Sequence, residues 1–206
     1  MNEGIYSVRQ ATNIVSRNRN ISERHVRRWL VVVRSPEKHR HGSATINFLD
    51  LIGLEMACRF RSEVGASLQR VRKVLEAMHR RFSELKHPLA QESFFTDGQS
   101  VWIDFEGHLE EIVGDQRGQI AVKSAIRTFA EEIQFIDGQA SVWDISEWIE
   151  INPRICFGEP VISGTRIPVS SIVACLEIDS PEEVARGFEI SVKRVEACAK
   201  FAQLPT

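Results

Sequence analysis

The sequence predicts a mainly α-helical chain with small β elements, divided into three segments of different charge. Apolar residues at helical spacing dominate both ends, and short β-branched runs beside Gly and Pro lie between them. Residues 1–82 carry 16 Lys and Arg against 7 Asp and Glu, residues 83–151 carry 4 against 14, and residues 152–206 carry 6 against 7. We therefore expect a helix-turn-helix with a hairpin wing (1–82), a central acidic α+β linker or dimerisation segment (83–151), and a C-terminal hairpin with three helices (152–206).

Bulk composition narrows the class of protein. No apolar run approaches the roughly 18 residues of a membrane span, so no membrane partner is expected. The N-terminal "MNEGIYSVRQ" lacks the basic-then-apolar order of a secretory signal. The four cysteines lie far apart without a C-x-x-C pair, which favours reduced thiols over a zinc site or disulfides. These features predict a soluble, cytoplasmic protein.

Two amphipathic helices are predicted at the start of the basic segment. The stretch "YSVRQATNIVS" (6–16) carries one apolar face, formed by Val8, Ala11, Ile14 and Val15. After the break "RNRN", the stretch "ISERHVRRWL" (21–30) begins at the N-cap candidate Ser22 and has an apolar stripe of Val26, Trp29 and Leu30. The other faces of this second helix are cationic. Such a helix suits the DNA major groove, where arginine binds guanine or phosphate.

A β-hairpin is expected next, between residues 31 and 46. A β-branched run leads into the tip "SPEKHRHGS", and a second short strand follows. A basic hairpin beside a recognition helix usually contacts phosphates or the minor groove. The predicted DNA-binding residues of the helix and hairpin are Arg24, His25, Arg27, Arg28, Arg34, Lys38 and Arg40. His39 and His41 form an H-x-H pair without a third ligand nearby, so no metal site is expected there.

Two further helices are predicted at 48–65 and 66–82. The second has Ser67 as a cap and a stripe of Leu68, Val71, Val74, Leu75 and Met78. The order of "YSVRQAT", "ISERHVRRW", the hairpin and "FLDLIGLEMACRFRSEVGASLQRVRKVLEAM" resembles the winged helix-turn-helix of MerR-type regulators. This resemblance implies that residues 1–82 bind operator DNA. A palindromic operator would require at least a dimer.

The acidic segment offers hairpin and helix signals but no catalytic pattern. Asp97-Gly98 and Asp137-Gly138 predict hairpin turns, and a helix is predicted at 121–135 with a face of Ile126, Phe129, Ala130 and Ile133. Its carboxylates raise the alternative of a metal-dependent nuclease: Asp104, Glu106, Glu110, Glu111 and Asp115. Several of these acids alternate with apolar residues as on a solvent-facing strand, so no catalytic residue and no metal are expected.

The stretch "GEPVISGTRIPV" (158–169) predicts a compact structural turn. A Walker-type phosphate loop requires G-x-x-x-x-G-K-[ST], and both the spacing and the lysine are absent here. Gly158 and Gly164 allow backbone conformations with positive φ, and Arg166 is expected to lock the turn by binding a carboxylate or carbonyl group. Three helices should follow, at 168–177, 180–188 and 191–202. Their predicted common core is Ile172, Leu176, Val184, Ala185, Phe188, Val195, Cys198 and Phe201.

The whole C-terminal pattern resembles a small bacterial antitoxin-type domain, formerly of unknown function, with the signature "I-x-P-x-x-x-x-G-x-P-x-I-x-G-T-R-I-P-V". Together with the N-terminal segment, the chain resembles VapB-type antitoxins. The resemblance implies a non-enzymatic antitoxin of a type II toxin-antitoxin system, without a cofactor, which neutralises a PIN-like toxin ribonuclease and represses its own operon. A homodimer or a larger toxin-antitoxin assembly is implied. The candidate toxin-binding residues are Arg154, Arg166, Arg186 and Arg194.

A second hypothesis is a MerR-like regulator that senses a small ligand in its C-terminal half and has no toxin partner. MerR-type regulators usually have a long dimerising helix followed by cysteine ligands or a ligand domain. Here Pro88 ends the fourth predicted helix and no cysteine pair follows, which favours the antitoxin.

Overall fold

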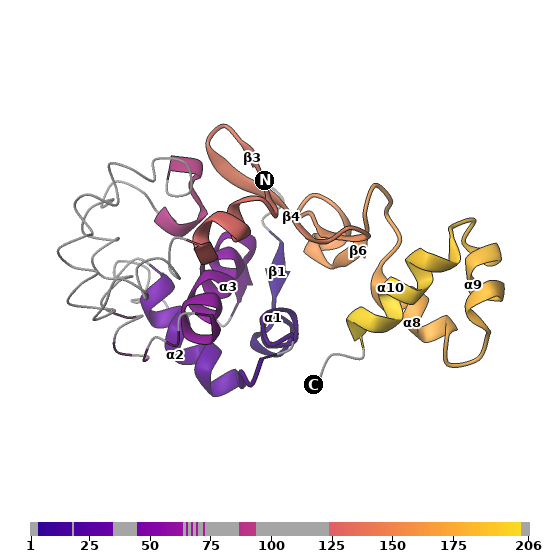
Figure 1. Cartoon of the computed structure of the whole chain (residues 1–206), viewed down its shortest axis with the longest axis horizontal. Coiled ribbons are helices and arrows are strands. Elements are labelled where there is room, and N and C mark those ends of the chain that lie inside the picture. The colour runs from indigo at the N-terminus through magenta and orange to yellow at the C-terminus, as the bar shows by residue number, and fades with distance from the viewer. Residues whose placement is uncertain are drawn as a thin grey trace.

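The computed structural model describes residues 4–17, 19–34, 45–63, 87–93 and 124–202, with the single residues Gly65, Ser67, Gln69 and Arg72. Within this part the chain has a mixed α/β fold. Figure 1 shows α1–α3 in one body and α8–α10 at the other end of the long axis, with a four-stranded sheet between them. Among the described helices, none has the length and apolar character needed to cross a membrane.

The N-terminal body is built on α1 (Val8–Val15), α2 (Glu23–Val33) and α3 (Phe48–Ser62). The predicted apolar faces of the first two helices are confirmed, because all seven of their residues are buried. Helix α1 starts with a capping box in which Ser7 accepts a hydrogen bond from the Gln10 backbone. Helix α3 begins with the same arrangement between Asn47 and Asp50, and every residue from Phe48 to Phe60 except Leu49 is buried.

The predicted hairpin after α2 is wrong in its first strand. Residues 31–33 continue the helix, because Val33 extends the buried stripe that Val26, Trp29 and Leu30 begin. The short strand β2 (Ile46–Asn47) pairs antiparallel with β1 (Ile5–Tyr6) at the start of the chain. The predicted hairpin tip, with Lys38, His39, Arg40 and His41, lies outside the described residues, as does almost all of the predicted helix at 66–82.

In the central segment the structure describes a short 3₁₀ helix, η2 (Pro88–Ala90), a helix at 124–130 and the sheet that follows. Ile126 and Phe129 of the helix are buried. The prediction that the helix continues through Ile133 is wrong, because the chain turns at 131–132 and Ile133 pairs with Trp143 in the sheet. The hairpin expected at Asp97-Gly98 and the acidic cluster between Asp104 and Asp115 lie outside the described residues.

The sheet is an antiparallel meander of β3 (Ile133–Ile136), β4 (Gln139–Ser146), β5 (Ile149–Ile151) and β6 (Pro160–Ile162). The predicted Asp137-Gly138 turn joins β3 to β4, and both of its residues have positive φ. The meander continues across position 151/152, where the charge pattern divides the chain. Ile151 packs in the core of the N-terminal body, whereas Ile149 packs in the core of the C-terminal helices, so the sheet connects the two cores.

The C-terminal helices form where the sequence predicts them. They are α8 (Val169–Cys175), α9 (Pro181–Gly187) and α10 (Val192–Ala202). Ser180 and Glu183 form a capping box, and Pro181 occupies the first turn of α9, where it costs no hydrogen bond. All eight predicted core residues lie in one hydrophobic cluster. Glycines 158 and 164 adopt φ values of 86° and 73°, as the turn prediction requires.

Candidate functional site

Helix α2 exposes a row of basic side chains over a buried apolar stripe. Arg24, His25, Arg27 and Arg28 are all exposed, as their predicted DNA-binding role requires. Arg27 makes an ion pair with Glu23 at 3.3 Å, but the two side chains remain 62% and 45% exposed. The pair is therefore weak, and the Arg27 guanidinium can leave Glu23 and bind a phosphate at little cost in free energy.

His25 has a local role as well as an exposed position. Its Nδ1 accepts a hydrogen bond from the backbone N–H of Ser22 at 3.1 Å, which completes the cap of α2. Because Nδ1 is the acceptor in this bond, Nε2 is the ring nitrogen that can bind an external partner. The ring also lies 6.0 Å from that of Trp29.

Arg34 differs from the four predicted DNA-binding residues of α2 described above, because its side chain is turned into the protein. Its guanidinium lies 2.9 Å from Asp50 Oδ2 in a largely buried ion pair and also donates to the carbonyl oxygen of Thr45. His87 Nδ1 lies 3.7 Å from the other oxygen of Asp50. Arg34 thus ties the end of α2 to the start of α3. The remaining two predicted residues, Lys38 and Arg40, lie outside the described residues.

A buried ionic network lies beneath these helices. Both oxygens of Glu55, whose side chain is fully buried, accept hydrogen bonds at 2.9 Å from Arg19. Arg59 donates to Glu55 at 2.8 Å and to Glu132 at 2.6 Å. Burial alone lowers the pKa of Arg59, but the two carboxylates outweigh burial and raise the pKa above its usual value. The network therefore joins α3 to the chain entering the sheet.

Arg17 links the two ends of the molecule through aromatic rings. Its guanidinium lies 5.1 Å from the centre of the Trp143 ring and 5.5 Å from that of Phe201. Trp143 belongs to β4 and Phe201 to the last turns of α10. Burial lowers the pKa of Arg17, and the charge of Glu55 opposes this effect. Sequence patterns gave no signal for this contact, because Arg17, Trp143 and Phe201 are distant from one another along the chain.

The four candidate toxin-binding arginines lie on four different elements. Arg154 and Arg166 lie in the turns before η3 (Cys156–Gly158) and before α8, while Arg186 and Arg194 lie on α9 and α10. All are exposed except Arg194, which is half-buried and stacks over the Trp148 ring at 5.3 Å. The four side chains thus project from separate elements of the C-terminal part of the chain.

The expectation that Arg166 locks its turn is wrong. The side chain is exposed and makes no hydrogen bond or ion pair within the described part of the chain. Thr165 stabilises the turn instead, because its Oγ1 donates to the Ile162 carbonyl at 2.8 Å and accepts from the Ile167 N–H at 3.1 Å. A hydroxyl beside the turn reaches these backbone groups more easily than a long guanidinium chain does.

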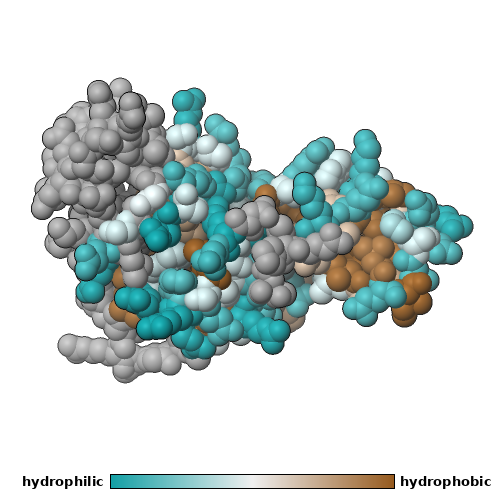
Figure 2. All heavy atoms as spheres, turned by 60° about the horizontal axis from the view of Figure 1, so that its bottom comes forward, coloured by the Kyte–Doolittle hydropathy of each residue, from teal (hydrophilic) through white to brown (hydrophobic). Residues whose placement is uncertain are grey.

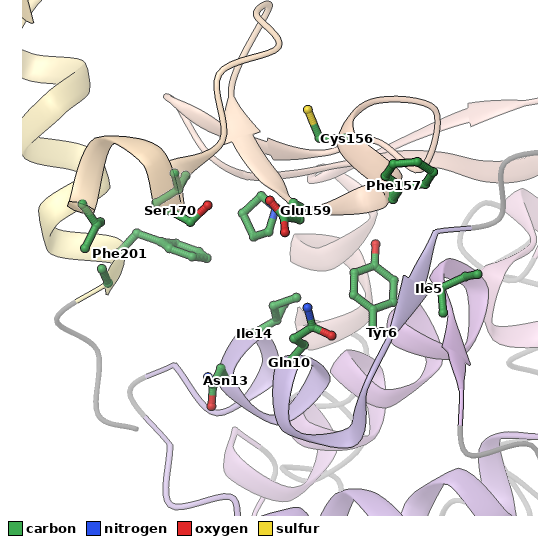
Figure 3. Close-up of a pocket in the computed structure, with 14 residues that line it drawn as sticks. Ile5, Tyr6, Gln10, Asn13, Ile14, Cys156, Phe157, Glu159, Ser170 and Phe201 are labelled. Carbon is green, nitrogen blue, oxygen red and sulfur yellow. The ribbon is translucent and has the colours of Figure 1, made fainter. Parts of the chain in front are cut away.

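A cavity of about 670 Å³ opens where the N-terminal body faces the C-terminal helices. Figure 3 shows side chains from β1 and α1 on one side, and from η3, α8 and α10 on the other. At one end Tyr6 donates its hydroxyl hydrogen to the carbonyl oxygen of Gly158 at 2.8 Å. Burial raises the pKa of Tyr6 above its usual value, so the phenol remains a donor. Sequence analysis placed Gly158 in a turn but gave no signal for Tyr6 as its partner.

The candidate metal ligands and the four cysteines are spread through the described part of the chain. The described residues contain no group of three His, Cys, Asp or Glu side chains that could hold a metal ion. All four cysteines are free thiols. Burial raises the pKa of Cys198 to about 11 and that of Cys58 well above its usual value, which keeps both in the unreactive thiol form.

Two comparisons with known proteins give a match, one for the C-terminal part and one for the fold of nearly the whole chain. Residues 149–202 match a family described as "Protein of unknown function (DUF433)", which covers β5, β6 and the three C-terminal helices. The fold of nearly the whole chain is similar to the crystal structure of Rv2018 from Mycobacterium tuberculosis, with a TM-score of 0.72 and 17% identity over 94% of this chain and 96% of that one. No curated protein matches the sequence.

Proposed function

We propose that the chain is an antitoxin that binds operator DNA through α2 and a PIN-like toxin ribonuclease through its C-terminal helices. The proposal extends to a soluble, cytoplasmic protein without enzymatic activity. One observation carries the DNA-binding part: Arg24, Arg27 and Arg28 project from a helix whose opposite face is buried. A rigid helix with exposed guanidinium groups can enter a major groove without repacking the core that supports it.

The DNA-binding part is tested by removing these cations without disturbing the core. We expect the triple variant Arg24→Ala, Arg27→Ala, Arg28→Ala to lose operator binding and to keep the wild-type melting temperature. A matched control removes three exposed cations from other elements: Arg127→Ala, Lys193→Ala and Lys200→Ala. Each lost phosphate contact should also lower the slope of log K against log salt by about one unit. Operator affinity equal in the two triple variants would overturn the assignment to α2.

The toxin-binding part has two supports, one from sequence and one from the surface. The C-terminal signature resembles that of antitoxin-type domains. Figure 2 shows hydrophobic surface gathered over the C-terminal end of the molecule, where Ile178 is 88% exposed and core residues such as Leu176 and Phe188 are only partly covered. Exposed apolar surface of this kind is typical of protein interfaces. Arg186 would provide a cation beside it for the carboxylates of a nuclease.

The full-length chain suits the toxin test better than a fragment starting at residue 152. Such a fragment would lack β5, whose Ile149 is buried in the core of the C-terminal helices. We expect Ile178→Asp with Arg186→Glu to abolish co-purification with the toxin and inhibition of RNA cleavage, while operator binding persists. The control Lys193→Glu makes a similar charge change on α10. If the double variant inhibits like wild type, the acidic segment 83–151 becomes the candidate toxin-binding region.

The same experiments separate the antitoxin from a ligand-responsive regulator. A PIN-like protein encoded beside this gene, co-purifying with the wild-type chain, would support the antitoxin. Operator binding without any such partner would support the regulator. In the antitoxin, we propose that the acidic segment speeds association with the basic rim of the toxin more than it strengthens the complex.

A further inference from the structure

The cavity between the two bodies has the dimensions of a small-molecule site. Its volume of about 670 Å³ falls within the roughly 300–1,000 Å³ usual for ligand pockets. Its walls come from segments at opposite ends of the sequence, β1 and α1 on one side and residues 156–173 with the end of α10 on the other. A molecule bound there would contact both bodies at once.

The walls are largely apolar and include three aromatic rings. Tyr6, Phe157 and Phe201 line the cavity together with aliphatic side chains such as Ile14 and Val173. Aromatic faces carry partial negative charge and attract cations that approach within about 6 Å. The apolar and aromatic lining therefore favours a molecule with an apolar body. The Phe201 ring already has the Arg17 guanidinium 5.5 Å from its centre, so among the three rings Phe157 and Tyr6 are the ones without that cation.

Phe157 is held at the rim of the cavity by an unusual backbone. Cys156, Phe157 and Gly158 are three successive residues with positive φ, at 46°, 55° and 86°. Two of them are not glycine, so the segment adopts a conformation that side chains disfavour. The result is a phenyl ring 78% exposed to solvent at the edge of an apolar cavity. Residues held in such sparsely populated backbone conformations cluster at active sites and ligand-binding sites.

Glu159 is the one charged side chain among the described residues that line the cavity. Within the described part of the chain its carboxylate makes no hydrogen bond or ion pair, and the same holds for the hydroxyl of Ser170. Across the cavity, the Oε1 of Gln10 accepts from Ser7, which leaves the NH₂ group of Gln10 for a ligand. Figure 3 shows these polar groups on facing sides of the space between the two bodies.

We propose that this cavity binds a small amphipathic amine, with the ammonium group on Glu159 and the apolar body between Phe157 and Phe201. A carboxylate or phosphate would meet the negative charge of Glu159, and no Lys or Arg is among the described lining residues, so we expect anions to bind less well than cations. This inference goes beyond the antitoxin proposal and requires neither toxin nor DNA for its test. Because the ligand bridges both bodies, its binding also stabilises their arrangement.

The test compares three probes of nearly equal size that differ in charge: 4-phenylbutylamine, 4-phenylbutanol and 4-phenylbutyrate. Binding to the full chain is measured by isothermal titration at physiological salt, and by the shift in melting temperature. We expect saturable 1:1 binding of the amine with a Kd of about 1 mM or tighter, weaker binding of the alcohol, and none of the carboxylate. Equal binding of the amine and the carboxylate would overturn the proposal.

Variants locate the binding within the cavity. Glu159→Gln should weaken binding of the amine about tenfold and leave binding of the alcohol unchanged, because only the amine interacts with the carboxylate. The control Glu177→Gln removes an exposed carboxylate outside the cavity and should change neither the affinity for the amine nor that for the alcohol. Phe157→Ala should weaken the amine and the alcohol alike. If Glu159→Gln and Glu177→Gln have the same effect, or if Phe157→Ala has none, the amine is not bound in this cavity and the proposal fails.

Discussion

The hydroxyl of Tyr6 donates a hydrogen bond to the carbonyl oxygen of Gly158, 152 positions further along the chain, at 2.8 Å. The contact is tight, since a Cβ added to Gly158 would lie 2.3 Å from the tyrosine oxygen. It joins β1 of the N-terminal body to the loop that leads into the last strand of the sheet. Close packing and one buried hydrogen bond thus connect β1 with a loop that lies 152 positions further along the chain.

Replacement of Gly158 by alanine should destabilise the protein more than the same change at Gly164. Both glycines have positive φ, so each alanine costs about 1–2 kcal/mol in backbone strain. Only the alanine at position 158 also collides with Tyr6, because nothing lies within 4 Å of a Cβ at Gly164. Urea unfolding should therefore give a loss of about 2–4 kcal/mol for Gly158→Ala. Equal losses for the two variants would show that the contact with Tyr6 is unimportant.

The single tyrosine of the chain offers a direct probe of the same contact at high pH. Burial raises the pKa of Tyr6, whereas the unfolded phenol ionises near its usual value of about 10. The stability contributed by this group is therefore full below about pH 10 and declines as the pH rises above that value. Tyrosinate absorbance should appear only together with alkaline unfolding. The variant Tyr6→Phe should lose about 1–3 kcal/mol at neutral pH and show a flatter alkaline decline.

Loss of Arg59 should be far more costly than loss of an exposed arginine. Arg59→Leu leaves Glu55 and Glu132 without their shared partner in a buried site, which should cost about 3–5 kcal/mol in unfolding free energy. The control Arg27→Ala breaks the exposed pair with Glu23 and should cost no more than about 1 kcal/mol. Denaturant midpoints of the two variants measure the difference. Similar midpoints would mean that the buried network contributes little.

Arg34 should act on stability, whereas Arg28 should act on DNA. Arg34→Ala leaves the buried carboxylate of Asp50 without its main partner, so we expect a loss of about 2–3 kcal/mol in the free energy of unfolding. Arg28→Ala should leave that free energy unchanged and weaken operator binding. Calorimetry and operator titration on both variants provide the comparison. An Arg34→Ala protein of normal stability that no longer binds the operator would make Arg34 a DNA contact instead.

Local sequence signals predicted the individual helices well. The capping box of Ser180 and Glu183, the proline after it, and the periodic core of α8–α10 all act within a few residues, so the sequence alone determined them. The same holds for the two glycine turns at positions 158 and 164. For residues 31–33 the local sequence does not decide between strand and helix, because β-branched residues are favoured in strands and can also extend a helix face that is already buried. Packing of Val33 beside Gly53 of α3 decides in favour of the helix.

The cavity and its connections arise only in the tertiary structure. Tyr6 and Gly158, or Arg17 with Trp143 and Phe201, meet because the sheet brings the two bodies together. The sequence marks Arg166 as a strong hydrogen-bond donor, yet the fold turns it to solvent and assigns the turn to Thr165. Periodicity and capping report interactions between near neighbours, whereas these contacts depend on how distant segments pack. The sequence alone therefore determined most of the described helices, and only the packing of the two bodies decided the site between them.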